Sequence, residues 1–347
     1  MIIQQDISLK PYNTFGIDVA ARGLATFSDK EILSGILAEH PSDRHLVLGG
    51  GSNLLFTQDF DGIVLKNEVK GIRIVAEDDD YVYVEAGAGE NWHGFVQHCI
   101  AGNLAGVENL SLIPGCVGAS PMQNIGAYGV EIKEVFHDLE AYHLRDGSVE
   151  RFTLNDCQFG YRDSVFKRKY KDQFVILHVT FQLRKRPRFN TSYGAIEQEL
   201  KKMGVKELSI KAVSDAVISI RSAKLPDPRQ IGNAGSFFKN PVVGAEKYRA
   251  LSDEFPGLPG YPAEPDGESP AGPGTPGQTK LAAGWMIEQC GWKGYRRGDA
   301  GCHERQALVL VNYGNATGKE IYDLSEDILR SVQQKFEVTL EREVNIC

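Results

Sequence analysis

HLVLGGGSNLL, residues 45–55, joins a short apolar run to three consecutive glycines, a serine and an asparagine. The run HLVL predicts a buried strand, and glycines after a strand allow a ligand or another backbone to approach closely. Successive backbone N–H groups, together with one hydroxyl and one amide, form the kind of loop that holds an anion. The stretch predicts a strand followed by either an anion-binding loop or a plain strand-terminating turn, and by itself it favours neither.

A second glycine-rich stretch, IPGCVGASPMQNIGAYG at residues 113–129, again combines glycines with a hydroxyl and side-chain amides. Neither stretch has the spacing of GxGxxG or the Lys-Ser/Thr ending of a Walker A loop, so the standard nucleotide fingerprints are not met. With EAGAGEN at residues 85–91, four glycine clusters fall within the first 130 residues, and turns alone do not account for so many. Two loops suited to anions that feed one site predict a bound dinucleotide whose phosphates are held from both sides.

The composition is that of a soluble globular protein. The 347 residues include 38 basic and 46 acidic side chains, which gives a net charge of −8, with 42% hydrophobic residues; this length suggests two or three domains. A net negative chain repels phosphate backbones, so we expect no nucleic-acid partner beyond a single nucleotide. No apolar run is long enough to span a bilayer, and the N-terminus lacks signal-peptide features. We therefore expect a cytoplasmic protein with no membrane partner.

Cysteine and histidine usage gives no sign of a metal or redox centre. The six cysteines contain no CxxC pair, so zinc knuckles and redox dithiols lack their usual spacing. In a cytosolic chain we expect free thiols that are buried or incidental. His178 lies in the alternating strand pattern FVILHVTFQL and is expected to be packed rather than to bind a ligand.

The remaining pattern alternates strands and helices, with the most periodic helix near the C-terminus. Predicted strands lie at 45–48, 62–66, 174–183 and 308–314, with hairpins at 72–89 and 139–154. Helices are predicted at 30–40, 91–103, 279–290 and 321–336, and in two pieces between 196 and 223. Ser28–Glu31 and Thr317–Glu320 have capping-box spacing before two of these helices.

One segment has the composition of a long loop. Between Pro256 and Gly277, 13 of 22 residues are glycine or proline, including seven of the fifteen prolines. Such a segment cannot sustain a helix or a central strand, so we expect a surface loop or a partly disordered insertion.

Several blocks resemble one known family, in the order in which that family carries them. The chain is similar to the UDP-N-acetylenolpyruvoylglucosamine reductases, in the longer of their two forms, which has a tyrosine-bearing loop. The blocks that carry the resemblance cover nearly the whole chain: NTFGI (13–17), LGGGSNLL (48–55), IPGCVGASPMQNIGAYG (113–129), FGYRDSVFK (159–167), RSAKLPDP (221–228), GNAGSFFKNP (232–241), KLAAGWMIEQCGWKG (280–294), HERQALVLVN (303–312) and LEREV (340–344).

The resemblance implies an α+β fold that holds FAD noncovalently. It implies an FAD-binding fold of the vanillyl-alcohol-oxidase type, in two subdomains, and an α/β substrate-binding domain. The matching boundaries are 1–69 for the first FAD-binding subdomain, with a C-terminal segment at about 337–347 returning to it, and 70–225 for the second. The substrate-binding domain would span 226–336, with the Pro/Gly-rich segment 256–277 as an insertion of which 263–277 looks longer than the family needs.

The implied activity is an NADPH-dependent step of peptidoglycan precursor synthesis, and hence of cell-wall biogenesis, cell shape and division. NADPH would reduce the flavin, flavin N5 would then deliver hydride to the β-carbon of the enolpyruvyl ether of UDP-N-acetylglucosamine enolpyruvate, and UDP-N-acetylmuramate would form. Ser236 matches the family's proton donor to the α-carbon, and a serine hydroxyl suffices against so basic a carbanion. Arg162 matches a guanidinium that suits the substrate carboxylate. Glu343 matches the catalytic glutamate, which we expect to act protonated.

The resemblance also implies binding residues. The cofactor-binding set is Gly49, Gly50, Gly51, Ser52, Asn53, Pro114, Gly115, Gly118, Ala119, Ser120, Gln123, Asn124, Gly126, Gly129 and Arg221. The substrate-binding set is Tyr161, Tyr193, Lys224, Asn240, Tyr261, Lys293 and Gln306. Tyr193 corresponds to the tyrosine of the mobile loop, and no metal is implied. We expect a monomer.

The chain departs from the family pattern at its end, and two other functions stay open. Glu343 lies four residues before Cys347, and Asn345 stands where a basic residue often follows, so pairing of the last residues as a strand must hold the glutamate. One alternative is an FAD oxidase of the same fold, although no histidine that could tether flavin lies in either glycine loop. The other is a catalytically silent UDP-sugar sensor, which would need no proton donor.

Overall fold

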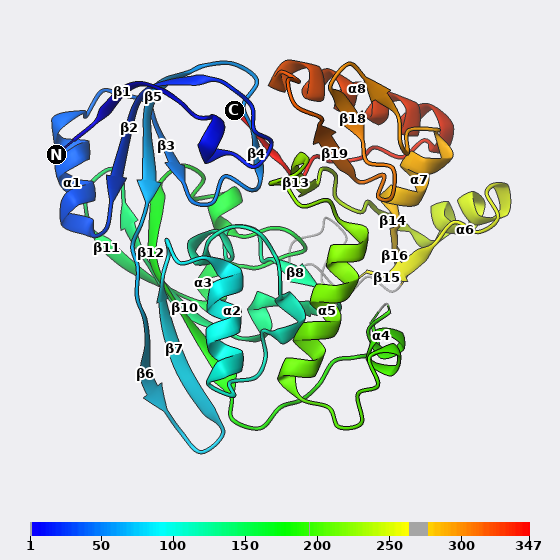
Figure 1. Ribbon diagram of the computed structural model, residues 1–347, viewed down its shortest axis with the longest axis horizontal. Coiled ribbons are helices and arrows are strands. Elements are labelled where there is room, and N and C mark those ends of the chain that lie inside the picture. Colours follow the sequence, from blue (N-terminus) through cyan, green and yellow to red (C-terminus); the bar gives the residue numbers. More distant parts are fainter. Residues whose placement is uncertain (1, 194, 264–276) are drawn as a thin grey trace. The chain divides into compact units, whose positions relative to one another are not determined.

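A computed structural model describes residues 2–193, 195–263 and 277–347, and its chain divides into two compact units (Figure 1). Unit 1 comprises residues 1–7, 21–50 and 61–223, and unit 2 comprises 8–20, 51–60 and 224–347. One of the boundaries between the units falls within the first glycine loop, and the last falls before Lys224, the final residue of a long helix. The three predicted domain boundaries are not tested by this division and stay a prediction.

Unit 1 is built on two sheets. The first has the order β1 (Gln4–Ser8), β2 (Ala20–Phe27), β5 (Phe60–Asn67), β3 (His45–Leu48), and β3 runs parallel to β5. The second has the order β11 (Val149–Thr153), β10 (Phe136–His143), β12 (Phe174–Arg184), β7 (Tyr81–Gly87), β6 (Ile72–Glu77), and its pairs are all antiparallel. The predicted strands and hairpins of this half are confirmed, except that β3, predicted to be buried, buries only Leu48 and leaves Val47 exposed. Strand β3 leads directly into the first glycine loop.

The main core of unit 1 lies between the second sheet and helix α2 (Trp92–Ala101). Trp92, Phe95 and Phe181 are fully buried there and contact one another through their rings, with centroids 4.7–5.7 Å apart. Burying three large rings supplies several kcal/mol, about 1.5–3 for each side chain. The sheet and α2 therefore form a rigid support for the loops at their ends.

Helix starts in unit 1 follow the sequence with one difference. Helix α1 (Lys30–Glu39) is capped by Asp29, whose Oδ1 accepts the N–H of Ile32 at 2.8 Å. The capping box predicted for Ser28 and Glu31 is therefore wrong by one residue, because the aspartate carboxylate is the better-placed acceptor.

Other predicted helices of unit 1 are also present. The two predicted helical pieces are α4 (Ile196–Lys202) and α5 (Ile210–Lys224), which pack through Leu200 and Val217. The unit also contains a short helix α3 (Leu154–Cys157) and a small hairpin, β8 (Gly126–Ala127) with β9 (Val130–Glu131).

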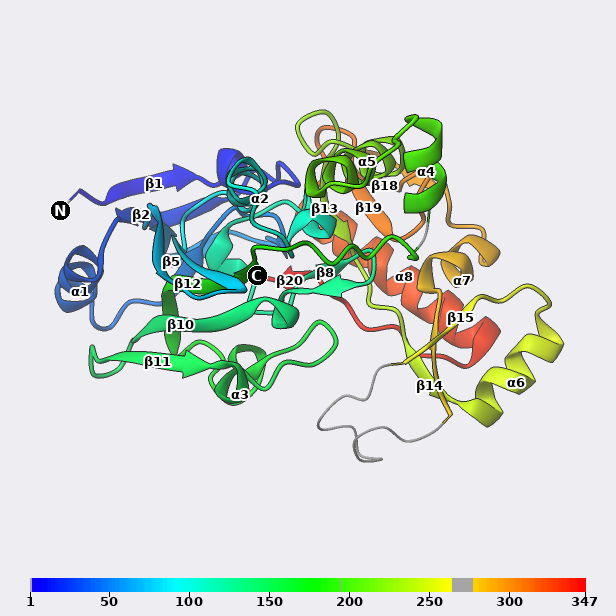
Figure 2. The ribbon, with the colours of Figure 1, turned by 90° about the horizontal axis from the view of Figure 1, so that it is seen from below.

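Unit 2 contains one four-stranded sheet and two smaller ones. The larger has the order β13 (Gly232–Ser236), β19 (Val309–Asn312), β18 (Ala300–Cys302), β17 (Arg296–Arg297). The second has the order β14 (Val242–Gly244), β16 (Gln278–Leu281), β15 (Gly260–Pro262), and helix α6 (Ala245–Glu254) follows β14. The third pairs β20 (Asn345–Ile346) in parallel with β4 (Leu54–Leu55), which follows the first glycine loop. Figure 2 marks the C-terminus beside β20.

Helix α8 (Gly318–Phe336) is the longest helix, and its start is as predicted. Thr317 accepts the N–H of Glu320, and the Glu320 carboxylate accepts the N–H of Thr317 at 2.7 Å, which completes a capping box. Its apolar side buries Ile321, Leu324, Ile328 and other residues. Gly318 is required at the first turn, because a Cβ there would lie 1.6 Å from the carbonyl oxygen of Phe56.

Two predictions in unit 2 need correction. Residues 279–281, predicted to begin a helix, belong to strand β16, and α7 (Ala283–Gln289) begins only afterwards. Within the glycine- and proline-rich segment, 260–262 form the strand β15, which lies at a sheet edge where proline is tolerated. The expected loop at 264–276 lies outside the described residues.

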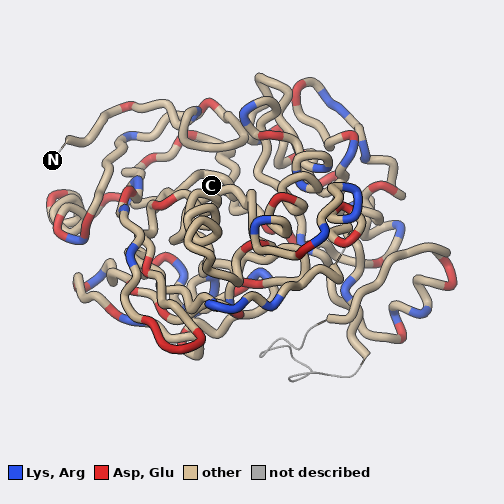
Figure 3. The backbone as a smooth tube through the Cα atoms, turned by 60° about the horizontal axis from the view of Figure 1, so that its bottom comes forward, with Lys and Arg blue, Asp and Glu red and all other residues tan. Residues whose placement is uncertain are grey.

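Acidic and basic residues occur throughout the chain, as the mixed composition predicts. Figure 3 shows acidic and basic residues spread along the tube in both units. The acidic turn of the β6–β7 hairpin is balanced by the segment after β12, through ion pairs of Lys185 with Glu77 at 3.1 Å and of Arg186 with Asp80 at 2.5 Å. Among the helices of residues 2–193, 195–263 and 277–347, none is long and apolar enough to cross a membrane.

Candidate active site

The first glycine loop is packed against other backbone. In unit 1, a Cβ on Gly50 would lie 2.8 Å from the Cα of Gly115, so the two glycine loops touch through their main chains. In unit 2, Gly51 has φ +62°, and a Cβ there would lie 2.0 Å from the carbonyl oxygen of Tyr12. Glycine at these two positions is thus explained by backbone packing as well as by the predicted anion site.

The second glycine loop is held in shape by hydrogen bonds of its own. Ser120 is buried, and its hydroxyl donates to the carbonyl of Val117 at 2.7 Å. Asn124, fully buried with φ +45°, donates its two amide N–H groups to Glu131 Oε2 at 2.7 Å and to the carbonyl of Gly160 at 3.0 Å. A hydrogen bond donated by Asn124 to a cofactor would therefore come from its backbone N–H, since both N–H groups of its side-chain amide are already used.

Arg162 lies against this second loop. Its Nη2 donates to the carbonyl of Gly126 at 2.5 Å, and its Nη1 lies 3.5 Å from the carbonyl of Asn124 and 3.8 Å from the Glu131 carboxylate. The residue has φ +54°, an uncommon backbone conformation for a residue other than glycine. Its guanidinium carbon lies 5.3 Å from the ring centre of Tyr161. The predicted catalytic guanidinium is thus a fixed, half-buried cation.

Arg221 on α5 adds a second cation near Arg162. Burial lowers the pKa of Arg221 below its usual value, Tyr128 acts in the opposite direction, and Arg162 lowers it again. Burial likewise lowers the pKa of His93, with Arg221 contributing. The Nε of Arg221 is buried and has no hydrogen-bond partner among the described residues. A buried guanidinium N–H without an acceptor favours a ligand that supplies one.

Ser236 and Glu343 lie on adjacent antiparallel segments of unit 2. Ser236 ends β13, and the N–H of Glu343 donates to the carbonyl of the next residue, Phe237, at 2.9 Å. Phe237 and Phe238 are fully buried, so this part of the chain is anchored in the core. Sequence blocks more than 100 residues apart are therefore brought side by side, as a shared role for Ser236 and Glu343 requires.

The C-terminus is held by strand pairing, as expected from the position of Glu343. Beyond the parallel β20–β4 pair, the N–H and the hydroxyl of Thr57 both donate to the carbonyl of Cys347 at 2.8 Å. Asn53, in the first glycine loop, donates its side-chain amide to the carbonyl of Glu343 at 3.3 Å. The predicted cofactor loop and the predicted catalytic glutamate are thus linked directly within unit 2.

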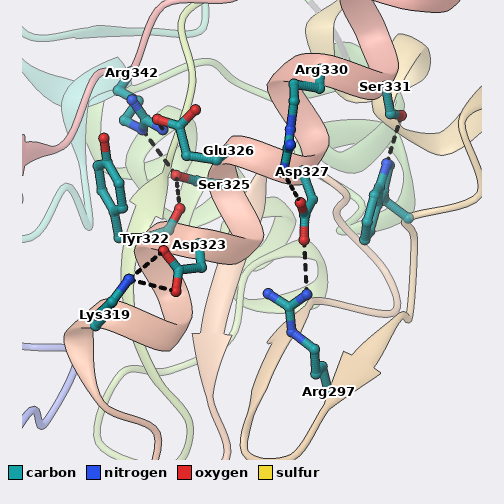
Figure 4. A network of polar contacts seen from close by, with 11 residues as sticks. Arg297, Lys319, Tyr322, Asp323, Ser325, Glu326, Asp327, Arg330, Ser331 and Arg342 are labelled. Atoms are coloured by element: carbon teal, nitrogen blue, oxygen red, sulfur yellow. Dashed lines mark hydrogen bonds and ion pairs between the residues drawn. The ribbon is translucent and has the colours of Figure 1, made fainter.

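Arg342, next to Glu343, is clamped by α8 (Figure 4). Its Nε donates to Ser325 Oγ at 2.9 Å, its Nη2 pairs with Glu326 Oε1 at 2.5 Å, and its guanidinium carbon lies 4.6 Å from the ring centre of Tyr322. Neither Arg342 nor Glu131 was among the predicted site residues. Their positions in the sequence could have indicated them, because Arg342 directly precedes Glu343 and Glu131 lies two residues after Gly129.

The predicted substrate residues are spread over both units, and several already have protein partners. Asn240 accepts the N–H of Ala283 at 3.0 Å and so caps α7, while Lys293 pairs with Glu288 at 2.8 Å. Tyr193 in unit 1 and Tyr261 on β15 are exposed by 48% and 42%, which leaves their rings accessible. Their roles, with those of Tyr161, Lys224 and Gln306, stay predictions.

A surface hollow on α8 contains none of the predicted site residues. It is lined by Arg297, Glu320, Asp323, Glu326, Asp327 and Arg330. Its charges pair with one another, since Asp327 binds both Arg297, at 2.8 Å, and Arg330 (Figure 4). We therefore place the active site elsewhere, and the described residues contain no cluster of side chains suited to a metal ion.

Comparison with known proteins defines the class of this protein as an FAD-dependent oxidoreductase. Residues 33–153 match an FAD binding domain, and residues 227–347 match the C-terminal domain of UDP-N-acetylenolpyruvoylglucosamine reductase. The chain belongs to the UDP-N-acetylenolpyruvoylglucosamine reductase family. It is 48% identical to the enzyme of that name from Amoebophilus asiaticus, over 100% of this chain and 99% of the relative, and 51% identical to that from Pseudomonas syringae pv. syringae, over 99% and 98%.

A solved structure supports the fold. The crystal structure of UDP-N-acetylenolpyruvylglucosamine reductase from Thermus caldophilus aligns with a TM-score of 0.68, covering 100% of this chain and 99% of that chain, at 24% identity. The predicted fold class, an FAD-binding domain of the vanillyl-alcohol-oxidase type followed by a substrate-binding domain, is thereby confirmed.

The residues present fit FAD. The buried Nε of Arg221 has no acceptor among the described residues, and a guanidinium suits a cofactor whose phosphates can supply one. Strand β3 leads into a loop of backbone N–H groups, which is the arrangement expected for a diphosphate.

Proposed function

We propose that this protein uses NADPH to reduce the enolpyruvyl ether of UDP-N-acetylglucosamine enolpyruvate to UDP-N-acetylmuramate, in the cytoplasmic synthesis of peptidoglycan precursors. Family membership supports the reaction, because the relatives that span the whole chain are named as reductases of this substrate type. The observation that carries the proposal is the 2.9 Å hydrogen bond from Glu343 to Phe237, which places the segment of the glutamate beside that of Ser236.

Reduction of a vinyl ether requires a hydride equivalent at the β-carbon and a proton at the α-carbon. FAD, when bound and reduced by NADPH, supplies the two electrons as hydride. Ser236 donates its hydroxyl proton to the α-carbon, and the resulting alkoxide is reprotonated before the next turnover. Placing a donor within hydrogen-bond reach of the carbon is worth about 10²–10⁴-fold in rate.

Arg162 holds the substrate carboxylate while negative charge develops on it. A planar guanidinium matches a carboxylate through two parallel N–H donors, and a fixed donor pays no reorganisation cost when the charge appears. Glu343 acts in its protonated form as a further donor to that carboxylate. We assign the remaining contacts to the sugar and the diphosphate, through Tyr161, Tyr193, Lys224, Asn240, Tyr261, Lys293 and Gln306.

Stopped-flow absorbance at the flavin band tests the proposal by separating the two half-reactions. NADPH should bleach the flavin, and the enolpyruvyl nucleotide should restore its colour. In Ser236→Ala we expect bleaching by NADPH within about twofold of wild type and recolouring slower by about 10²-fold or more, since only the second step needs the proton. A partial recovery in Ser236→Cys would reflect its remaining proton donor.

Three outcomes would contradict the proposal. Equal slowing of both half-reactions in Ser236→Ala would remove the proton-donor role. Rapid reoxidation by air without a response to the enolpyruvyl nucleotide would instead indicate an oxidase. Binding of UDP-sugars without any NADPH turnover would indicate a sensor.

A further inference from the structure

Glu131 is a half-buried carboxylate at the end of β9, directly after the second glycine loop. Its side chain is 18% exposed. It is fixed at both ends of its own short turn, since its carboxylate accepts the N–H of Glu134 and its N–H donates to the Glu134 carboxylate at 2.7 Å. The carboxylate therefore occupies a defined position rather than a range of solvent-exposed rotamers.

Three donors converge on the Glu131 carboxylate from different parts of unit 1. The Asn124 amide donates to Oε2 at 2.7 Å, the Lys133 ammonium lies 3.0 Å from the same oxygen, and Nη1 of Arg162 lies 3.8 Å from Oε1. Arg162 and Glu131 are exposed to the same small extent, 18% each. Their attraction is thus less screened than that of a surface ion pair.

The backbone around the pair is shaped to let it form. A Cβ on Gly126 would lie 2.8 Å from Cγ of Glu131 and 3.0 Å from Nη1 of Arg162. Any larger residue at position 126 would therefore separate the carboxylate from the guanidinium. Here the glycine serves the approach of two side chains to each other.

Asn124 connects the two loops that carry the pair. Besides its bond to Glu131, it donates to the carbonyl of Gly160, two residues before Arg162, at 3.0 Å, and accepts the N–H of Lys133 at 3.1 Å. Both Asn124 and Arg162 have positive φ, near +45° and +54°. Strained backbone of this kind persists where surrounding contacts over-determine it.

We infer that Glu131 is a positioning residue, which holds the guanidinium of Arg162 in the orientation that receives the substrate carboxylate. The inference rests on the proposed function, because it gives Glu131 a role through Arg162 and not through the substrate. An unrestrained arginine loses about 2 kcal/mol of side-chain rotamer entropy when it is fixed. Glu131 and the carbonyls of residues 124 and 126 already restrict the rotamers of Arg162 before substrate binds. The guanidinium is therefore correctly oriented when negative charge develops on the substrate carboxylate.

The first test compares Glu131→Gln with the control variant Glu150→Gln, which removes an exposed carboxylate on β11 of the same unit. We expect kcat for reduction of the enolpyruvyl nucleotide to fall about 10- to 100-fold in Glu131→Gln, in the range of a slightly misplaced catalytic group. Bleaching of the flavin by NADPH should stay within about twofold in both variants, and Glu150→Gln should keep its kcat within the same margin. Glu131→Asp, which keeps the charge, should recover part of the loss.

A double-mutant cycle with Arg162→Lys identifies the path of the effect. If Glu131 acts through the guanidinium, Glu131→Gln should change kcat by less than about twofold in the Arg162→Lys background. Additive losses would overturn the inference. So would equal losses in Glu131→Gln and Glu131→Asp accompanied by slower bleaching or a lower Tm, because those changes indicate a structural role.

Wild-type turnover separates this inference from the proposed function. If the wild-type protein fails to reduce the enolpyruvyl nucleotide, the proposed function itself is wrong. If wild type turns over and Glu131→Gln matches it, the positioning role alone is wrong.

Discussion

The glycines of the two glycine-rich loops have different structural roles. Glycines at 50, 51 and 126 allow, respectively, loop-to-loop contact, an approach to the carbonyl of Tyr12, and the meeting of Glu131 with Arg162. The thiols are simpler: all six cysteines are free, and Cys99, Cys157 and Cys302 are fully buried. This agrees with the expectation of free thiols drawn from their spacing.

The buried thiols predict a loss of stability at alkaline pH. Burial raises the pKa of Cys157 from 9.0 to about 12. Its contribution to the free energy of unfolding is complete below pH 9 and is lost as the pH rises from 9 toward 12, because only the unfolded state releases the proton in that range. In Cys157→Ala, the fall in unfolding free energy between pH 9.5 and 11 should be shallower by up to about 1.4 kcal/mol per pH unit.

Urea unfolding at a series of pH values measures this slope. Val165→Ala is the control, since it removes buried volume from the same core without removing a titrating group, and it should leave the slope unchanged. A Cys157→Ala slope equal to that of wild type would show that this thiol ionises equally in both states.

At the scale of elements, α8 holds the segment that carries Glu343, a proposed catalytic residue, through its contacts with Arg342. Its buried side anchors the helix in unit 2, and its polar residues Ser325 and Glu326 clamp Arg342, the neighbour of Glu343. The pair of Arg330 with Asp327 on the same helix is far more exposed, 70% at the arginine against 19% for Arg342. Replacing Arg342, which packs against α8, should therefore lower the free energy of unfolding more than replacing Arg330, which lies on α8.

We expect Arg342→Met to lower the unfolding free energy by about 1–3 kcal/mol, because a hydrogen-bonded charged group is lost from a largely buried position. Arg330→Met should cost less than about 0.5 kcal/mol. Because Glu343 adjoins the clamp, Arg342→Met should also slow recolouring of the flavin by substrate more than its bleaching by NADPH. Chemical denaturation and the stopped-flow assay measure both effects, and equal costs for the two variants would exclude the clamp.

At the scale of the whole molecule, family membership identifies a flavoprotein, and this has a thermodynamic consequence. A ligand that binds only the folded state stabilises it by mass action, by about 2.7 kcal/mol at a concentration 100 times its Kd. The purified protein should be yellow, and stripping its flavin should lower Tm by several degrees. Adding FAD should restore Tm, whereas riboflavin, which lacks the phosphates that we expect the glycine loops to hold, should restore less. A Tm insensitive to FAD would contradict the assigned cofactor site.

The sequence predicted the helices α1, α2, α5 and α8 and the strands of the second sheet of unit 1, because apolar periodicity and capping residues are local signals. It did not predict β1, β2, α6 or the short strands β13 to β18. It failed at 279–281, where tertiary pairing with β14 and β15 makes a strand of residues with helical spacing. The candidate site residues came from separate sequence motifs, and only the resemblance to a known family indicated that these motifs contribute to one site. The contacts that arrange these motifs, such as Glu131 with Arg162 or Arg342 with α8, join residues 16–31 positions apart through turns whose geometry no local pattern specifies.

The pairing of β20 with β4 has a consequence for biosynthesis. Leu54 and Leu55 leave the ribosome about 290 residues before their partners Asn345 and Ile346 exist. At roughly 5–20 residues per second, this strand waits about 15–60 s for its neighbour. A chain without residues 345–347 lacks the β20 partner and the carbonyl that Thr57 binds. Such a chain would leave Glu343, a proposed catalytic residue, on a frayed segment, so these three residues would determine whether that carboxylate is held in place.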